Sequence, residues 1–426
     1  MPPESFWTED RGYPEVTHYL AGFIVLISKS VWIRRTILVL SILISGGNLL
    51  IPRLPILFVI VLLCLVARDW VIDFKRNMAP IFVLLAAILV LTVLRPSGSD
   101  IQSTAIRYAN FIAGVLLLDL YLHAGSAALS RDLYVVLRVM VWQALITVVL
   151  AQLFNFLFVP LVVSDTPYST FLLLFNYHIM LEDSTSIIRP DGFFYEPGVF
   201  QIYLNIFLYL TLFVLKKWRQ AIFAVAAVFS TQSTTGIVIA FTIICWFIAT
   251  EYLNRGSLAM RVGKMFVAAA VIGALAFAAS GNIKEKLMGE SQGSYWARQY
   301  DLLTGLNVIA VHPWFGIGFD YDQYYRASSE LGYADTKLPD RIIQERGNSN
   351  GIIVLLYSIG IPLSIPFLVG MFRQLFFPNL ILTGIMLVLS FFGESIIFTP
   401  FFLLFVFSGM LTKSRVAQSA QLAHDF

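Results

Sequence analysis

Long uninterrupted apolar runs are the feature that most restricts how this chain can fold. Segments such as Leu57–Ala67 and Phe401–Phe407 contain no charged residue, and 58% of all residues are hydrophobic while 13% are charged. A soluble domain carries about 25% charged residues, so lipid must be the solvent for most of this chain. Only helices and closed barrels satisfy their backbone groups in lipid. Because the runs are continuous rather than alternating, we predict an all-α polytopic membrane protein.

The apolar segments predict about 12 membrane spans, with 11 to 13 as the range that their lengths allow. The segment 16–30 is apolar but short, and it is either an interfacial helix or a thirteenth span. The expected spans are 36–52, 54–72, 79–94, 107–124, 133–160, 197–215, 220–232, 235–252, 265–280, 350–371, 378–394 and 397–412.

Basic residues orient this scheme, because short cytoplasmic loops are rich in Lys and Arg. The span order places five basic clusters on one side, which we take as cytoplasmic. It requires 220–232 and 235–252 to form a hairpin that turns at Thr231–Gly236. The clusters are Arg34-Arg35, Lys75-Arg76, Lys216-Lys217 with Arg219, Arg255 to Lys264, and Lys413 with Arg415.

Two long hydrophilic stretches, 164–196 and 281–349, then lie on the periplasmic side. Loops of more than about 15 residues are usually functional or disordered. Both stretches are rich in aromatic residues, Gly and Pro, so we expect them to be ordered. The chain thus divides into N-terminal helices at 1–163, a first periplasmic loop at 164–196, central helices at 197–280, a large periplasmic loop at 281–349, and C-terminal helices with a short cytoplasmic tail at 350–426. The acidic N-terminus lacks a basic region, so we predict no cleavable signal peptide.

The densest polar motif, Arg189–Gly198, ends the first outer loop and reads RPDGFFYEPG. Its Pro and Gly residues predict a defined turn. The next segment places Gln201, Asn205 and Tyr209 at four-residue steps on one helix face. Polar residues at membrane depth usually face a bundle interior or a wet cavity. The pattern predicts a hydrophilic pocket below the loop; a plain helix-entry loop held by a salt bridge is the alternative.

The second outer loop carries several arginines, among them Arg298, Arg341 and Arg346, and Asn348 precedes the next span. Arg presents a planar fork of donors that matches phosphate oxygens. Several Arg residues at the outer face of a membrane therefore suit a lipid-linked diphosphate. A solvated charged loop is the alternative for each of them. No basic stripe is long enough to follow a phosphate backbone, which excludes nucleic acid as a partner.

Other polar residues give weaker signals. His312 precedes a proline among apolar residues, which favours a packing role. Asp320-Tyr321-Asp322 has the spacing of a metal-binding D-x-D pattern, but three residues are a poor signal. Asp119 and His123 are four residues apart on one expected helix, where a structural pair is the simpler reading. Glu394 is a carboxylate near the outer end of a span and is a functional hypothesis by default. We expect neither a metal nor a cofactor.

These motifs, in this order, resemble the bacterial family of O-antigen polymerases and O-antigen ligases. The resemblance covers about 160–370 and rests on Arg189–Pro197 at the head of a span, Ser233–Gly236, Arg298, and His312–Phe319. It implies a metal-independent, inverting membrane glycosyltransferase. Such an enzyme takes a glycan from undecaprenyl diphosphate at the periplasmic face of the bacterial inner membrane and joins it to an acceptor glycan. It also suggests a chain-length regulator protein as a partner, besides membrane lipid.

One departure from the family concerns the segment before the span that follows the large loop. Many relatives carry His-Asn there, whereas this chain has Gly347-Asn348. The difference leans towards a polymerase of lipid-linked repeat units, with a ligase that transfers the glycan to lipid A-core as the alternative. A transporter of lipid-linked oligosaccharides is the rival from another class. Transporters typically show internal repeats and helices broken at the midplane, and neither is visible in the sequence.

For a reaction of this kind we predict roles for individual residues from their chemistry and position. Arg189 and Arg298 would bind the diphosphate, with Arg341 or Arg346 as a third. Glu196 is the first choice for the general base and Asp191 the second. Outer loops that converge over one polar pocket near the outer leaflet would favour the enzyme over the transporter. The expected substrate-binding residues are Asp191, Tyr195, Gln201, Asn205, Arg341, Arg346 and Asn348.

Overall fold

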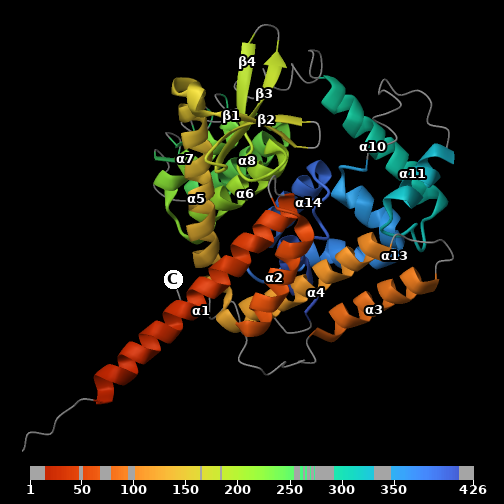
Figure 1. The fold of residues 1–426 in the computed structure, drawn as a ribbon, viewed down its shortest axis with the longest axis horizontal. Helices are drawn as coiled ribbons and strands as arrows, with labels where there is room; N and C mark the ends of the chain where they lie inside the picture. Colours follow the sequence, from red (N-terminus) through yellow and green to blue (C-terminus); the bar gives the residue numbers. More distant parts are fainter. Residues whose placement is uncertain are drawn as a thin grey trace, which may run out of the picture.

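The apolar runs form helices, which make up most of the described chain (Figure 1). The computed structural model describes residues 15–47, 51–67, 78–94, 101–163, 166–182, 185–253, 260–261, 264–265, 269, 273, 292–330 and 347–411. The helices named in the text are α1 (Glu15–Gly46), α2 (Arg53–Val66), α3 (Ala79–Leu94), α4 (Ile101–Ala124), α5 (Ser126–Leu153), α6 (Pro197–Tyr209), α7 (Trp218–Ser230), α8 (Thr234–Phe247), α10 (Gln292–Val311), α11 (Tyr321–Glu330), α13 (Gly351–Arg373), α14 (Leu380–Gly393) and α15 (Pro400–Ser408).

Five helical segments are long and apolar enough to cross a membrane: 102–124, 126–153, 197–214, 234–252 and 351–373. The third and fourth of these reach their length because π-helical turns extend α6 to Val214 and α8 to Tyr252. Each expected span except 265–280 falls on a helix, and 265–280 lies outside the described residues apart from isolated positions. Segment 16–30 is helical and continuous with the first expected span in α1. A helical membrane protein is confirmed, whereas the total of about 12 crossings stays a prediction.

The first outer loop corrects the all-α expectation, because it folds as a four-stranded antiparallel sheet. The strands are β1 (Val159–Val163), β2 (Thr166–Phe171), β3 (Phe175–Glu182) and β4 (Thr185–Pro190), in the order β1-β2-β3-β4. The expected span 133–160 was therefore too long, since α5 ends at Leu153. The segment is rich in β-branched and aromatic residues, which favour strands. Beyond the hydrocarbon, water satisfies the sheet edges that lipid would not.

The second outer loop packs its Gly-containing turn at Gly316–Gly318 against a break in α13. The chain leaves the helical conformation at Gly360, where φ is +79°. This break leaves carbonyl groups without helical partners, and the backbone N–H groups of Ile317 and Gly318 donate to the carbonyls of Tyr357 and Ser358 at 2.7 and 3.0 Å. A side chain at Gly316 would strike this part of α13. The His312–Phe319 motif is thus an architectural clamp between the loop and α13.

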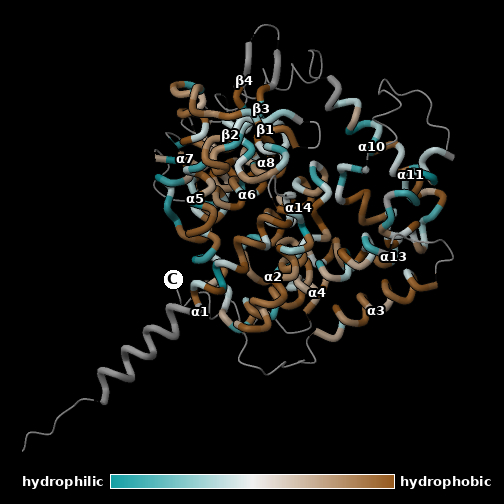
Figure 2. Tube along the Cα trace, in the orientation of Figure 1, coloured by the Kyte–Doolittle hydropathy of each residue, from teal (hydrophilic) through white to brown (hydrophobic). Residues whose placement is uncertain are grey.

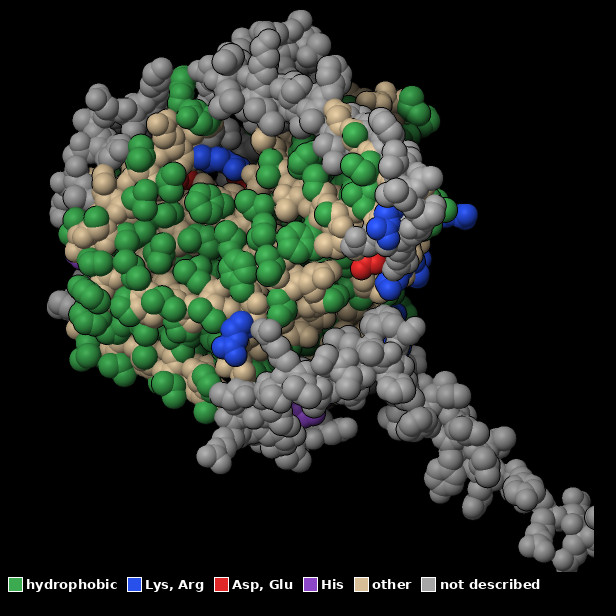
Figure 3. All heavy atoms as spheres, turned by 180° about the vertical axis from the view of Figure 1, so that it is seen from behind, with side chains coloured by type: hydrophobic (Ala, Val, Ile, Leu, Met, Phe, Trp, Pro, Cys, Tyr) green, Lys and Arg blue, Asp and Glu red, His purple; other side chains and the backbone are tan. Residues whose placement is uncertain are grey.

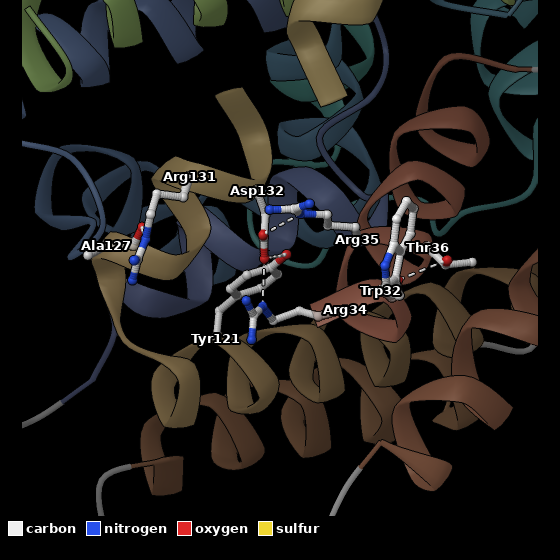
Figure 4. Close-up of polar contacts among 8 residues, drawn as sticks. All are labelled: Trp32, Arg34, Arg35, Thr36, Tyr121, Ala127, Arg131 and Asp132. Carbon is white, nitrogen blue, oxygen red and sulfur yellow. Dashed lines mark hydrogen bonds and ion pairs between the residues drawn. The ribbon is translucent and has the colours of Figure 1, made fainter. Parts of the chain in front are cut away.

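A buried ion-pair cluster lies at the opposite end of the helices from the sheet. Asp132 of α5 accepts from Arg34 and Arg35 of α1 at 2.6 and 2.9 Å, and Tyr121 of α4 donates to the same carboxylate at 3.4 Å (Figure 4). Removing one partner of such a buried pair typically costs about 3–5 kcal/mol. The cluster therefore fixes α1 against α4 and α5.

A second predicted basic cluster, Lys216-Lys217 with Arg219, lies at the same end of the helices. Lys217 Nζ lies 4.2 Å from the centroid of the Tyr134 ring on α5, and Tyr134 donates to Gln220 Oε1 at 2.7 Å. The remaining basic clusters lie wholly or partly outside the described residues. Between the two ends the surface is largely apolar: Figure 2 shows hydrophobic helices, and Figure 3 shows a broad hydrophobic face with basic side chains near its edges, one of them in a hollow.

Candidate functional site

The sheet positions a chain of three polar side chains at the head of α6. His178 of β3 stands opposite Arg189 of β4 in the antiparallel register. His178 Nδ1 donates to Asp191 Oδ1 at 2.8 Å, and Arg189 Nη1 donates to His178 Nε2 at 3.4 Å. Asp191 follows directly after β4 and is 0% exposed. Burial raises the pKa of its carboxyl to about 6, although the hydrogen bond from His178 and the charge of Arg189 oppose that rise.

The turn between α7 and α8 is where the two outer loops meet. This turn, at Thr231–Gly236 as predicted, receives Arg189 at its first residue, since Arg189 Nε donates to the carbonyl of Thr231 at 3.2 Å. Arg298 of α10 reaches the other end of the same turn and donates from Nη1 to Thr235 Oγ1 at 3.1 Å. Arg189 and Arg298 come from segments more than a hundred residues apart, yet they bracket one short turn.

The polar stripe on α6 supports this turn from below. Asn205 Nδ2 donates to Gln201 Oε1 at 2.8 Å and to the carbonyl of Gly236 at 3.1 Å. A side chain at Gly236 would contact Gln201 at 2.8 Å, so glycine allows α8 to approach α6 closely. Gln201 and Asn205 are buried, and Tyr209 donates to the carbonyl of Pro378. The stripe faces a bundle interior, as expected, and its amides tie α6 to α8.

Two carboxylates flank the start of α6. A Cβ atom built on Gly198 would meet Glu394 Oε1 and lie 3.8 Å from Glu196 Oε2. Glu196 is exposed, whereas Glu394, in the connection between α14 and α15, is 8% exposed. Burial raises the pKa of Glu394 well above its ordinary value, the charge of Glu196 adds to the rise, and the charge of Arg298 opposes it. Glu196 and Arg298 therefore both act electrostatically on Glu394, with opposite signs.

The other predicted site residues have different surroundings. Tyr195 is half-buried and its carbonyl accepts from Tyr168 at 2.8 Å. Asn348 is buried and donates to the carbonyl of Asp301 at 2.5 Å and to Tyr324 at 3.0 Å, so it anchors the end of the second loop. Arg341 and Arg346 lie outside the described residues.

The weaker candidates have local roles. Asp320 accepts from the backbone N–H of Asp322 at 3.0 Å, which is a contact at the start of α11. His123 Nδ1 lies 2.8 Å from the carbonyl of Asp119 and 3.6 Å from its carboxylate. His312 is exposed. Within the described ranges, no group of three His, Cys, Asp or Glu residues is arranged to hold a metal ion.

One residue of the site was missed by sequence reasoning. His178 lies in the first outer loop. Because no strands were predicted in that loop, there was no reason to pair His178 with Arg189. The alternation of FNYHIMLE in β3, with period two, was the signal that could have placed it on a strand. Glu394 was a candidate, but its distance from Glu196 in sequence gave no sign that the two carboxylates meet.

The comparisons with known proteins bear on the second half of this arrangement. Residues 220–368 match the family model described as O-antigen ligase. No curated protein and no solved structure matches the chain. The matched range contains the α7–α8 turn, Arg298 and the clamp at Gly316–Gly318, while Arg189 and Glu196 precede it. The predicted resemblance is confirmed over residues 220–368, where this helical membrane protein is similar to the O-antigen ligase family.

Proposed function

We propose that the protein is a membrane glycosyltransferase that joins undecaprenyl-diphosphate-linked oligosaccharide units into a surface polysaccharide at the periplasmic face of the inner membrane. The observation that carries the proposal is the convergence of both outer segments on the α7–α8 turn, with Arg189 at Thr231 and Arg298 at Thr235. The family match supports a transferase of the O-antigen ligase or polymerase type. The reaction links the anomeric carbon of the donor glycan to an acceptor hydroxyl, and the lipid diphosphate leaves.

Arg189 and Arg298 are the groups that we assign to the leaving diphosphate. Each has a guanidinium group at the same turn, and bidentate Arg–phosphate pairs are among the strongest charge-assisted hydrogen bonds. Charge that develops on the diphosphate as the glycosidic bond breaks is best stabilised by donors already in place. The hydrogen bonds of Arg189 to His178 and to the turn hold its side chain in one orientation. Arg341 and Arg346 remain predictions for a third cation.

Glu196 is the group that we assign as general base. Its exposed carboxylate lies at the head of α6 beside the Arg298–Glu394 pair, and it takes the proton of the acceptor hydroxyl as that oxygen bonds to the anomeric carbon. Burial raises the pKa of Glu394 and thereby favours its protonated form, whereas the exposed Glu196 is open to the acceptor. Asp191 is completely buried against His178, which suits a residue that orients Arg189 better than a base.

The position of the polar groups supports an enzyme over a transporter. Glu196 precedes α6, Thr231 follows α7, Thr235 lies in the first turn of α8, and Glu394 follows α14. The candidate site is therefore built at helix ends, while a transporter typically places its polar residues near the bilayer midplane. Tyr195, Gln201, Asn205 and Asn348 would complete the substrate site as direct contacts or supports. A chain-length regulator as partner remains a prediction.

A ligase is the second candidate, because the family model that matches is described as O-antigen ligase. The glycan profile of a deletion strain separates the two activities. Loss of long chains, with single units still attached to their acceptor, supports the polymerase. Loss of every attached unit supports the ligase and contradicts our proposal. A deletion that leaves the glycan profile unchanged and blocks export of lipid-linked units supports the transporter.

A further inference from the structure

A second pair of arginines lies at the same end of the helices as Glu196 and takes no part in the site described above. Arg53 begins α2, and Arg107 lies in the second turn of α4. Their guanidinium groups are close enough to repel each other. The guanidinium carbon of Arg107 lies 5.7 Å from the centroid of the Phe398 ring. Arg53 Nη2 lies 3.0 Å from the position that a Cβ atom on Gly47 would occupy, and the Tyr195 ring borders that position at 2.6 Å.

This pair lacks a counter-charge. Among the residues that the structure describes, neither Arg53 nor Arg107 has a hydrogen bond or an ion pair with a protein group, whereas Arg34 and Arg35 share the carboxylate of Asp132. Two neighbouring cations at the edge of a membrane protein are unfavourable unless an anion joins them. Arg53 is exposed and Arg107 is partly exposed. An anion can therefore reach both.

The two arginine pairs lie near the same two connections. In the connection between β4 and α6, Glu196 stands near Arg298 and Glu394, while the adjacent Tyr195 stands near Arg53. In the connection between α14 and α15, Glu394 faces the first pair and Phe398 lies under Arg107. The connection that carries the candidate base thus borders both cationic groups. This is the arrangement that a reaction between two anionic substrates requires.

We propose that Arg53 and Arg107 form a second phosphate-binding site, which holds the diphosphate of the lipid-linked acceptor while Arg189 and Arg298 hold that of the donor. The identity of the ligand rests on the proposed function. The planar guanidinium forks suit the oxygens of a diphosphate. Tyr195 and Phe398 give the site an aromatic wall beside the charge. Each substrate would enter with its lipid tail in the membrane and its glycan directed towards Glu196.

The test counts bound lipid on the full-length protein. Wild-type protein in phosphatidylcholine nanodiscs is titrated with undecaprenyl diphosphate, and bound lipid is counted by native mass spectrometry. We expect two lipids per chain for the wild type. The double variant Arg53→Gln with Arg107→Gln should bind one, and so should Arg189→Gln with Arg298→Gln. Arg219→Gln, an exposed arginine at the opposite end, is the matched control and should bind two.

Other outcomes overturn the proposal. One bound lipid on the wild type removes the second site, as do two on the Arg53 and Arg107 double variant. Displacement of one lipid by an equimolar amount of phosphatidylglycerol assigns the pair to bulk lipid headgroups instead.

Should the double variant fail to fold, Arg107→Lys keeps the positive charge but lacks the planar guanidinium fork, and its second lipid should bind about tenfold more weakly. In a transfer assay, Arg53→Gln should raise KM for the acceptor and leave KM for the donor unchanged. Two bound lipids without any glycan transfer would refute the proposed function while the second site stands.

Discussion

The carboxylate pair at the head of α6 gives the sharpest prediction, because the two members should respond differently to the same change. Glutamine in place of Glu196 keeps the shape and the hydrogen bonding of the side chain but removes its basicity. A positioned general base contributes about 10²–10⁴-fold to a rate, which corresponds to about 2.7–5.5 kcal/mol of barrier. We therefore expect Glu196→Gln to lower kcat by this factor and to leave donor binding intact.

Glutamine in place of Glu394 provides the internal comparison. Burial and the charge of Glu196 raise the pKa of Glu394 and so favour its protonated form, which glutamine imitates. Glu394→Gln should keep kcat within about threefold of wild type, since no group that acts in the transition state is lost. As pH rises through the raised pKa of Glu394, the wild-type enzyme gains a charge beside Glu196. The variant cannot ionise there, so its activity should persist to higher pH.

The assay is turnover of purified protein on lipid-linked donor and acceptor across a range of pH. Thermal unfolding in the same detergent establishes that each variant is folded. Activity of Glu196→Gln within about threefold of wild type would end the base assignment, because the loss would be far below that expected for a positioned base. Glu196 would then act only through its charge. A large loss in Glu394→Gln with normal Glu196→Gln activity would transfer the role of base to Glu394.

Four further predictions follow from the same contacts. Arg189→Ala and Arg298→Ala should each abolish polymer without lowering protein levels, and lysine should rescue poorly because a point charge lacks the bidentate fork; full polymer in either alanine variant removes that arginine from the site. A topology reporter fused near Glu330 should be active only outside the cytoplasm, and cytoplasmic activity would invert the orientation. Gly316→Ala should lower the melting temperature, because φ at this position is +64° and the backbone of α13 lies in contact; an unchanged melting temperature would refute the clamp. The pKa of Asp191 is raised to about 6, so the folded protein binds this proton more tightly than the unfolded chain and stability should increase as pH falls from about 7 towards 4; in Asp191→Asn this part of the pH dependence should disappear.

The parts of the fold that could be predicted are those set by local pattern. Continuous apolar runs placed the helices, and the polar turn at Thr231–Gly236 marked the hairpin of α7 and α8. The sheet was not predicted, because aromatic and β-branched residues in a hydrophilic stretch were interpreted as a loop. An open sheet is compatible only with a position outside the hydrocarbon, and such a position depends on the tertiary arrangement rather than on the local residue pattern.

The candidate site, like the fold, could be predicted only where local pattern determines it. The motif at Arg189–Gly198 and the position of Arg298 were visible as charge and turn chemistry, but the partners of these residues were not. His178 meets Arg189 through strand register, and Glu394 meets Glu196 because α14 ends where α6 begins. Such contacts between distant segments carry no local signature. For the same reason the Gly316–Gly318 segment looked like a functional motif, although its contacts with α13 are structural.

The construction of the site from helix ends explains how one chain can be both very apolar and chemically active. Glu196 and Glu394 lie directly outside α6 and α14, Arg189 is the penultimate residue of β4, and Arg298 lies in the second turn of α10. Their charges therefore need not be carried through hydrocarbon. A lipid-linked substrate is divided in the same way as the protein: its apolar tail lies in the membrane and its charged head lies at the membrane edge. Helices such as α6 and α8 can stay buried and apolar over most of their length, and only their first turns need to be shaped for the reaction. Changes confined to these first turns and connections should therefore alter which glycan is joined, whereas changes within the helices should act through stability.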